Sequence, residues 1–257
     1  DVYKRQVLKV REHRSAENRR LAAARVAFQT ASLKAASGPR LDAVFYCPKL
    51  PRRRPQGRDL LGATMKLFYS PNACSLGIHV ILEEIGKPFE LMKVDLASGA
   101  QYKEPFISLN PKSKVPALGL ADGSVITEWP AVAWYLAKTN PEAHLLPTTL
   151  EGEVKALELL DYMIATVHMR GFTRIFRPAN FTPTTADEPA VQRTGREIVE
   201  AGFKQLAQSL GAKAYLLGDF SIADAALFYL THWGVNRAKT TLPPALTSHL
   251  ELSLIHI

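Results

Sequence analysis

The chain has 257 residues and a formal charge of +8, with 32 Lys and Arg against 24 Asp and Glu. At about 150 residues per domain, this length allows one large domain or two small ones. A hydrophobic content of 47% argues against overall disorder, and no run approaches the ~18 apolar residues of a membrane helix. Two cysteines, Cys47 and Cys74, make no disulfide framework and predict a reducing compartment, the cytoplasm.

The positive charge is confined to the N-terminal quarter of the chain. Residues 1–64 hold fifteen Lys and Arg and five Asp and Glu, a net charge of +10. Residues 65–257 hold seventeen Lys and Arg and nineteen Asp and Glu, a net charge of −2. Nucleic-acid binding, which the overall charge suggests, therefore rests on residues 1–64 alone and is not expected of the rest.

Residues 1–64 show few signals of packed structure. Residues 12–36 are rich in Ala, Arg and Leu and favour a helix, whereas the arginine-rich run 48–57 is typical of unpacked chain. An organellar transit peptide and an RNA-binding arm are two interpretations of such an Arg-rich, acid-poor segment. We expect a third, a disordered or spurious basic leader outside the native protein, because Asp1 is no initiator and Met65 opens a strand.

Residues 65–143 predict a mixed α/β domain. Short apolar runs alternate with a segment of helical spacing, which ends at Gly86, and the turn signal Ala121-Asp122-Gly123 separates two runs typical of a hairpin. The first two strands should pair in parallel, because a helix lies between them. The predicted strands are 66–69 and 89–96, with a helix at 76–85 between them. The hairpin spans 117–126, and a second helix follows at 130–140.

Residues 151–251 predict an all-helical domain after a linker at 141–150. Apolar positions recur at i, i+3 and i+4 through three segments, 152–176, 187–210 and 221–236. After a proline break, residues 246–251 begin one more short helix. We expect this helical domain to lack its last element.

Ser221 and Asp224 have the spacing of a capping box at the start of the third helical segment. The Asp224 carboxylate is expected to bond the N–H groups at the start of its own helix. We therefore assign this pair to the fold and not to substrate binding, and expect Asp224→Ala to cost ~1 kcal/mol or more.

Four stretches carry a family resemblance: residues 65–75, 110–118, 127–128 and 218–224. Together with a thioredoxin-like α/β domain followed by an all-α domain, they make residues 65–251 resemble a cytosolic glutathione S-transferase. Cys74 followed by Ser75 is similar to the bacterial beta class rather than to the Tyr- or Ser-dependent classes. The resemblance implies glutathione as co-substrate, a small hydrophobic electrophile, a detoxification role, a homodimer and no metal.

Cys74 is the expected catalytic residue. It lies between a strand and a helix start, where unpaired N–H groups and the helix dipole are expected to lower the pKa of a thiol. The alternative is a buried small hydrophobic residue. The resemblance implies that Cys74 contacts the glutathione sulfur and forms a mixed disulfide with it. Ser75 either donates a hydrogen bond to the thiolate or caps the helix.

The resemblance also implies residues that bind glutathione. The Val115-Pro116 bond is expected to be cis, which presents the N–H and C=O of Val115 to the cysteinyl backbone of glutathione as an added strand would. Glu128 is expected to face the amino group of the γ-glutamyl end. Trp129, where the family has a small residue, either points outward or shapes the pocket. Tyr69 and Lys114 complete this set, Tyr69 as a packed strand residue rather than a catalytic phenol.

The first helix of the all-α domain is expected to supply further site residues. The beta class carries a histidine there, but an ungapped match places Met169 at that position and His168 about 100° away around the helix. His168 is thus either a catalytic residue, after a local shift, or a histidine on the helix face. Thr166 and Arg170 match polar family positions and are expected ligands. The family also has a lysine in the loop after the second strand. Lys103 and Lys112 are the two candidates for its role in this chain.

The predicted function is conjugation of the glutathione thiolate to hydrophobic electrophiles. The pocket between the domains is expected to be lined by Phe172, Ile175 and Phe176. A first alternative is glutathione-dependent thiol–disulfide exchange or peroxide reduction through Cys74. A second is a non-catalytic binding protein of the same fold, which loss of Cys74 or Glu128 would favour, although both are present.

Overall fold

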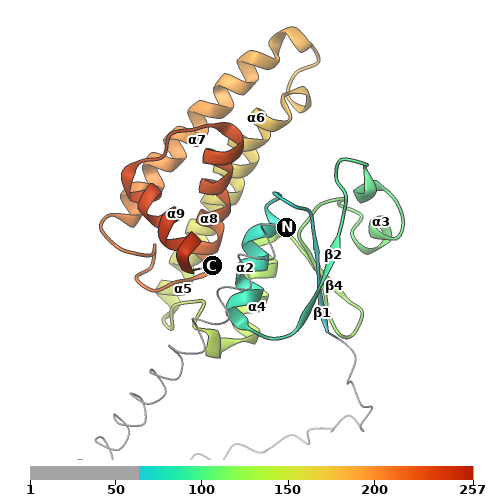
Figure 1. The fold of residues 1–257 in the computed structure, drawn as a ribbon, viewed down its shortest axis with the longest axis vertical. Helices are drawn as coiled ribbons and strands as arrows, with labels where there is room; N and C mark the ends of the chain where they lie inside the picture. Colours follow the sequence, from blue (N-terminus) through green and yellow to red (C-terminus); the bar gives the residue numbers. More distant parts are fainter. Residues whose placement is uncertain (1–63, 257) are drawn as a thin grey trace, which may run out of the picture. The chain divides into compact units, whose positions relative to one another are not determined.

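The computed structural model describes residues 64–256 (Figure 1). The predicted basic leader, residues 1–64, lies outside the described residues except for Thr64, and so does Cys47. Within the described residues, every helix is too short or too polar to cross a membrane.

The first half of the described chain forms a mixed sheet. Strands β1 (Met65–Tyr69) and β2 (Phe89–Lys93) pair in parallel, as predicted from the helix between them, although β2 ends three residues earlier than expected. Strands β3 (Ala117–Gly119) and β4 (Val125–Thr127) form the predicted hairpin. Within residues 64–256, these strands make a four-stranded sheet in the order β2-β1-β3-β4, with β1 antiparallel to β3.

Helices cover both faces of this sheet. Helices α2 (Ser75–Ile85) and α4 (Trp129–Thr139) lie on one side and the short helix α3 (Phe106–Leu109) on the other (Figure 1). Because side chains alternate along a strand, Phe68 of β1 packs on Phe106 of α3, and its neighbour Leu67 is buried on the opposite face. This arrangement confirms the predicted thioredoxin-like domain.

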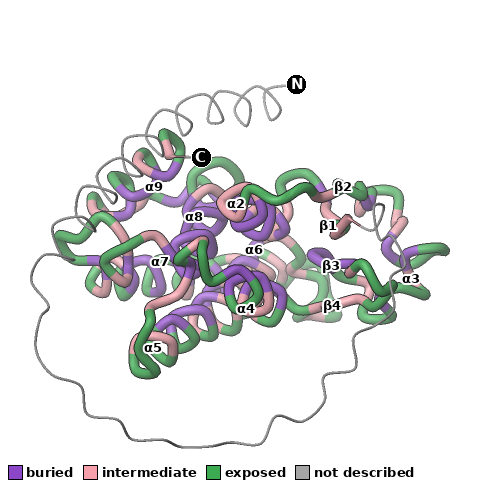
Figure 2. The backbone as a smooth tube through the Cα atoms, turned by 90° about the horizontal axis from the view of Figure 1, so that it is seen from below, coloured by how far each residue is buried: buried purple, intermediate pink, exposed green. Residues whose placement is uncertain are grey.

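The second half of the described chain is all-α, as predicted. Helix α8 contributes eleven buried residues and is the centre of this part, with its burial evident in Figure 2. The helical elements are α5 (Leu150–Asp161), the π-helical segment η3 (Tyr162–Phe172), α6 (Thr173–Phe176), α7 (Glu188–Leu210), α8 (Ile222–Trp233), the π-helical turn η6 (Gly234–Ala238) and α9 (Pro244–His256). The one helix predicted over 152–176 is thus interrupted by a π-helical segment.

Helices α2 and α8 pack closely, and Gly77 makes this possible. A Cβ atom at this position would lie 2.7 Å from the carbonyl oxygen of Ala225 and 2.8 Å from a ring carbon of Trp129. The absent side chain thus lets α8 approach the helix that begins beside Cys74. The close approach brings side chains of the all-α half to the candidate site.

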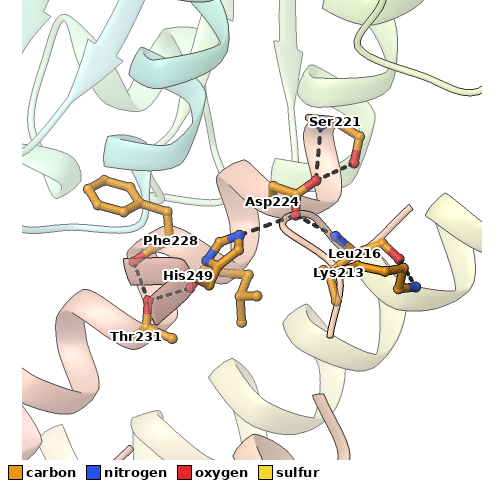
Figure 3. Close-up of polar contacts among 8 residues, drawn as sticks. Lys213, Leu216, Ser221, Asp224, Phe228, Thr231 and His249 are labelled. Atoms are coloured by element: carbon orange, nitrogen blue, oxygen red, sulfur yellow. Dashed lines mark hydrogen bonds and ion pairs between the residues drawn. The ribbon is translucent and has the colours of Figure 1, made fainter. Parts of the chain in front are cut away.

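The capping box at Ser221 and Asp224 is present, and it reaches further than its own helix (Figure 3). The Asp224 carboxylate accepts hydrogen bonds from the N–H and the hydroxyl of Ser221 and from the N–H of Leu216, at 2.8 to 3.0 Å. Nε2 of His249, on α9, lies 3.2 Å from the same carboxylate. Asp224 and His249 have fully buried side chains, so one carboxylate joins three segments of the all-α half.

Candidate active site

Cys74 occupies the turn between β1 and α2 that the sequence predicts. Asn72 adopts a left-handed backbone conformation at φ 58°, and the Ala73 N–H donates to the Ser70 carbonyl at 3.1 Å. Cys74 is partly buried, and its thiol donates a hydrogen bond to the backbone carbonyl of Val115 at 3.3 Å. The loop thus places the sulfur against the backbone of a segment 41 residues away.

The predicted lowering of the Cys74 pKa is wrong. Removal of the thiol from water raises its pKa from 9.0 to about 12. The N–H groups of Cys74 and Ser75 and the charge of Lys114 lower the pKa, as expected at a helix start, and Glu128 raises it. Desolvation outweighs these effects, since burial disfavours the charged form of an acid.

Ser75 has a role other than the two expected. Its hydroxyl donates to the Ser70 carbonyl and accepts from the Ser70 N–H, each at 3.2 Å, and the side chain is buried. The hydroxyl therefore ties the two ends of the loop that presents Cys74. Among the residues that the structure describes, both hydrogen bonds of this hydroxyl are made to Ser70.

The segment expected to hold the glutathione backbone lies against Cys74. The Val115-Pro116 bond is cis, as predicted, and the described chain has a second cis bond at Glu104-Pro105 that the sequence analysis did not predict. Val115 is buried, and its carbonyl accepts the Cys74 hydrogen bond. The backbone carbonyl that the sequence analysis expects to meet glutathione therefore lies within hydrogen-bond distance of the Cys74 sulfur.

Glu128 holds a backbone conformation that few non-glycine residues adopt. Its φ is 73°, at the start of α4, a departure that proteins concentrate at functional sites. The carboxylate is exposed and lies 2.9 Å from Nζ of Lys112, which also donates to the Thr127 hydroxyl. Lys112 therefore lies beside Glu128, whereas the other candidate lysine, Lys103, donates to the Ser98 carbonyl in its own loop.

Trp129 points inward. The side chain is 4% exposed, and its indole N–H donates to the Cys74 carbonyl at 2.9 Å. Of the two orientations that the sequence left open, the structure has the one that shapes the site. The bulky residue at this position thus fixes the backbone of Cys74.

The π-helical segment η3 decides between His168 and Met169. A π-helix changes the angular phase of the residues that follow, and Met169 is 42% exposed whereas His168 points toward α8. Nδ1 of His168 lies 3.2 Å from the hydroxyl of Tyr229, and its ring packs edge-on against Tyr229 and Trp233. His168 rather than Met169 therefore turns inward, and its catalytic role stays a prediction.

Tyr229 and Trp233 belong to the site but were missed in the sequence analysis. Both lie on α8, four residues apart and hence on one face, which was the available signal. Burial raises the pKa of Tyr229 well above 10, and the charge of Cys74 adds to this, so the two groups lie within electrostatic range. The Trp233 indole N–H donates to the Asn72 carbonyl at 2.8 Å.

The remaining predicted residues are spread around this centre. Lys114 lies close enough for its charge to lower the pKa of both Cys74 and His168. The Tyr69 ring lies against His79, in keeping with a packed strand residue. Arg170 is exposed, and Thr166 lines a cavity of about 480 Å³ between α5, η3 and α7, to which Cys74 does not contribute.

The residues expected to line the acceptor pocket differ in exposure. Phe172 and Ile175 are buried in the core, whereas Phe176 is partly exposed and stacks under Arg237. No group of three or more His, Cys, Asp and Glu within residues 64–256 is placed to hold a metal ion.

Comparisons with known proteins agree with this geometry. A family model described as "Glutathione S-transferase, N-terminal domain" matches residues 72–139. The chain is 38% identical over 173 residues to glutathione S-transferase GstA of Escherichia coli O157:H7, which covers 66% of this chain and 82% of that protein. The chain belongs to the glutathione S-transferase family.

Two further similarities refine this assignment of a family. A beta-class glutathione S-transferase structure from Sphingomonas chungbukensis superposes with a TM-score of 0.61 at 33% identity, covering 72% of this chain and 90% of that one. The maleylacetoacetate isomerase of Mus musculus is 26% identical over 200 residues, 76% of this chain and 88% of that protein. Relatives of this glutathione S-transferase family member thus include proteins named for two different reactions.

His168 yields a prediction for this family member. Burial, with a smaller effect of Lys114, lowers the pKa of His168 from 6.5 to about 4, so the ring is neutral at pH 7. Between pH 6.5 and 4 the unfolded chain binds a proton that the folded chain does not, so stability contributed by this group falls as the pH falls. An NMR titration, with His168→Gln to assign the resonance, should place its midpoint near pH 4. A midpoint above 6 would contradict the buried neutral ring.

Proposed function

We propose that this protein conjugates glutathione to electrophiles in the manner of the beta class, with a protonated Cys74 as hydrogen-bond donor to the glutathione thiolate. The observation that carries the proposal is the 3.3 Å hydrogen bond from the Cys74 thiol to the Val115 carbonyl, beside the cis Val115-Pro116 bond. A sulfur at this place meets the cysteinyl part of a glutathione bound along Val115. Glutathione is thus the proposed co-substrate.

The raised pKa of Cys74 supports its role as a donor. A thiol with a pKa of about 12 is protonated at pH 7 and offers its S–H to a negatively charged sulfur. His168, with a pKa of about 4, is neutral and adds no charge. In the reaction, the glutathione thiol releases its proton to solvent, its sulfur bonds to the electrophilic carbon, and the leaving group departs with its electron pair.

We also propose binding roles for the residues around Cys74. Glu128, held at a positive φ beside Lys112, is placed to meet the γ-glutamyl amino group, and Lys112 to meet a carboxylate of glutathione. Ser75 and Trp129 hold the Cys74 loop in place. Thr166 is not included, because it lines a different cavity.

A pair of substitutions at Cys74 tests this role. Cys74→Ser keeps a hydrogen-bond donor and is expected to retain conjugation of a chlorodinitrobenzene within about tenfold. Cys74→Ala removes the donor and is expected to lower kcat/KM about 10- to 100-fold, since a hydrogen bond to a charged group contributes about 1.5–3 kcal/mol. Steady-state kinetics, with binding to immobilised glutathione as the control for folding, measure both. Equal losses in the two variants would contradict the role of donor.

Thiol–disulfide exchange is the second candidate, and the sulfur of Cys74 at the glutathione site favours it. In that reaction the Cys74 thiolate attacks glutathione disulfide. One glutathione leaves as its thiolate, and the other stays bound to Cys74 in a mixed disulfide. Both Cys74→Ser and Cys74→Ala would then lose activity completely. Mass spectrometry of the mixed disulfide, together with transhydrogenase assays, separates this reaction from conjugation.

Glutathione-dependent isomerisation is a third candidate, favoured by the similarity to maleylacetoacetate isomerase over 88% of that protein. It requires the same bound glutathione and differs in the acceptor. An assay with a maleyl substrate beside the chlorodinitrobenzene assay tells the two apart.

We propose that the protein works as a cytoplasmic homodimer. Helix α5 carries an apolar stripe of Leu150, Val154 and Leu157, which are 71%, 55% and 45% exposed and share one face of the helix. Exposed apolar surface of this kind is typical of an interface. A second copy of the chain is the proposed occupant of this face.

A further inference from the structure

Arg237 lies beside the loop that carries Cys74. It belongs to the turn η6 that follows α8, and its Nη1 donates to the Asn72 carbonyl at 3.3 Å. The same carbonyl accepts from the Trp233 indole N–H at 2.8 Å. Asn72 precedes Cys74 by two residues, so these contacts place a guanidinium group next to the proposed reaction centre.

Two aromatic rings support this guanidinium group. Its central carbon lies 4.0 Å from the ring centroid of Phe176 and 5.3 Å from that of Trp233. Stacking against rings fixes the plane of an arginine side chain and leaves its N–H groups directed to the edges. Arg237 is still exposed, so some of these donors face solvent.

A second arginine adds to this positive charge. Arg177 follows Phe176 directly, and its charge, together with partial burial, lowers the pKa of Arg237. Across residues 64–256, neither Arg177 nor Arg237 has a carboxylate within ion-pair distance. Two like charges held close without a counter-ion repel each other, and a bound anion offsets that repulsion.

A lysine near the sulfur adds a further positive charge. Lys114 acts electrostatically on both Cys74 and His168. The acidic group that acts on Cys74, Glu128, is already paired with Lys112. The side of the site formed by Arg177, Arg237 and Phe176 over the buried Trp233, which we name the arginine–aromatic wall, therefore combines unpaired positive charge with a partly exposed aromatic ring.

We propose that the arginine–aromatic wall selects electrophiles that carry a carboxylate on a flat apolar group. The guanidinium of Arg237 binds the carboxylate, since its planar fork matches two carboxylate oxygens, and Arg177 adds attraction. Phe176, which is partly exposed, contacts the apolar part of the acceptor, and the buried Trp233 supports the guanidinium from below. The inference rests on the proposed function, because it takes Cys74 to mark the position of the glutathione sulfur.

Two acceptors of nearly equal size test the proposal, each rate being divided by the uncatalysed rate with glutathione because the ester is intrinsically the more reactive. We expect this normalised kcat/KM to be at least tenfold higher for 4-chloro-3,5-dinitrobenzoate than for the methyl ester of the same compound. Arg237→Gln is expected to lower kcat/KM at least tenfold for the benzoate and by less than twofold for the ester. Arg237→Lys, which keeps the charge but not the fork, should give an intermediate value. The matched control is Arg193→Gln, at an exposed arginine on α7, which should leave kcat/KM unchanged for both acceptors.

A binding measurement separates failure of this inference from failure of the proposed function. The non-reactive 3,5-dinitrobenzoate should quench tryptophan fluorescence with a Kd at least tenfold lower than that of its methyl ester, and Arg237→Gln should remove the difference. If neither chlorinated acceptor is turned over, the transferase assignment fails while the two Kd values still decide the arginine–aromatic wall. Equal Kd values, or equal losses for both acceptors in Arg237→Gln, would overturn the inference.

Discussion

Asp224→Ala is expected to lower the free energy of unfolding by about 3–5 kcal/mol, since it leaves several buried hydrogen-bond donors without an acceptor and each such group costs about 1–3 kcal/mol. The fully buried carboxylate accepts from the Leu216 N–H and from the N–H and hydroxyl of Ser221, and it lies 3.2 Å from Nε2 of His249. The substitution leaves these buried groups without their acceptor, a larger cost than the ~1 kcal/mol of an ordinary helix cap. Urea unfolding followed by circular dichroism measures the change.

A matched control is Glu158→Ala. Glu158 is an exposed carboxylate paired with Lys155, and its loss is expected to change stability by no more than about 0.5 kcal/mol. Folded Asp224→Ala should keep its affinity for immobilised glutathione, since Asp224 contacts no residue of the site. A destabilisation below 1 kcal/mol, or a loss of glutathione affinity without destabilisation, would refute the structural role of this carboxylate.

The Cys74 thiol is expected to react with iodoacetamide at pH 7 about a thousandfold more slowly in the folded protein than in urea. Only the thiolate is the nucleophile, and each unit of pKa changes its population about tenfold. Burial raises the pKa from 9.0 to about 12, so the thiolate is correspondingly rarer in the folded state. Mass spectrometry of the peptide that contains Cys74 measures this rate apart from that of Cys47.

The pH dependence of the reaction with iodoacetamide gives the sign of the shift in the Cys74 pKa. For a thiol in the unfolded chain the rate stops rising near pH 9, whereas for folded Cys74 it should still rise tenfold per pH unit from 7 to 10. Folded Cys74 also keeps a proton that the unfolded chain loses above pH 9, so its contribution to stability falls from there toward pH 12. A folded-state rate that levels off below pH 8 would instead show the lowered pKa that a helix start alone predicts.

Local patterns predicted most of the secondary structure because they depend on neighbours in the sequence. The turn after β1, the left-handed Gly86 that ends α2, the hairpin around Asp122 and the capping box at Ser221 each use short-range hydrogen bonds or backbone preferences. The π-helical segment η3 escaped prediction, because its hydrogen-bond pattern differs from that of an α-helix and leaves no distinct composition. Its consequence, the inward turn of His168, was therefore left open.

Residues of the site were likewise predicted where a local motif contains them and missed where only tertiary packing brings them in. Cys74, the cis Val115-Pro116 bond and Glu128 were predicted from motifs, and the structure places the first two in contact. Tyr229, Trp233 and Arg237 were not, because they reach the site through the packing of α8 on α2 at Gly77. Residues 150 or more positions from Cys74 carry no sequence signal of that approach.

The sequence by itself determined the order of elements, the family and the position of Cys74 at the turn between β1 and α2. These depend on local spacing and on motifs that stay recognisable without coordinates. The tertiary structure alone decided the protonation of the site, because the cost of burial sums over every neighbour of Cys74 and His168, most of them distant in sequence. It also decided the orientation of Trp129, which follows from a contact with Cys74, 55 residues away in the chain, and the placement of Arg237, which follows from a contact between the two halves.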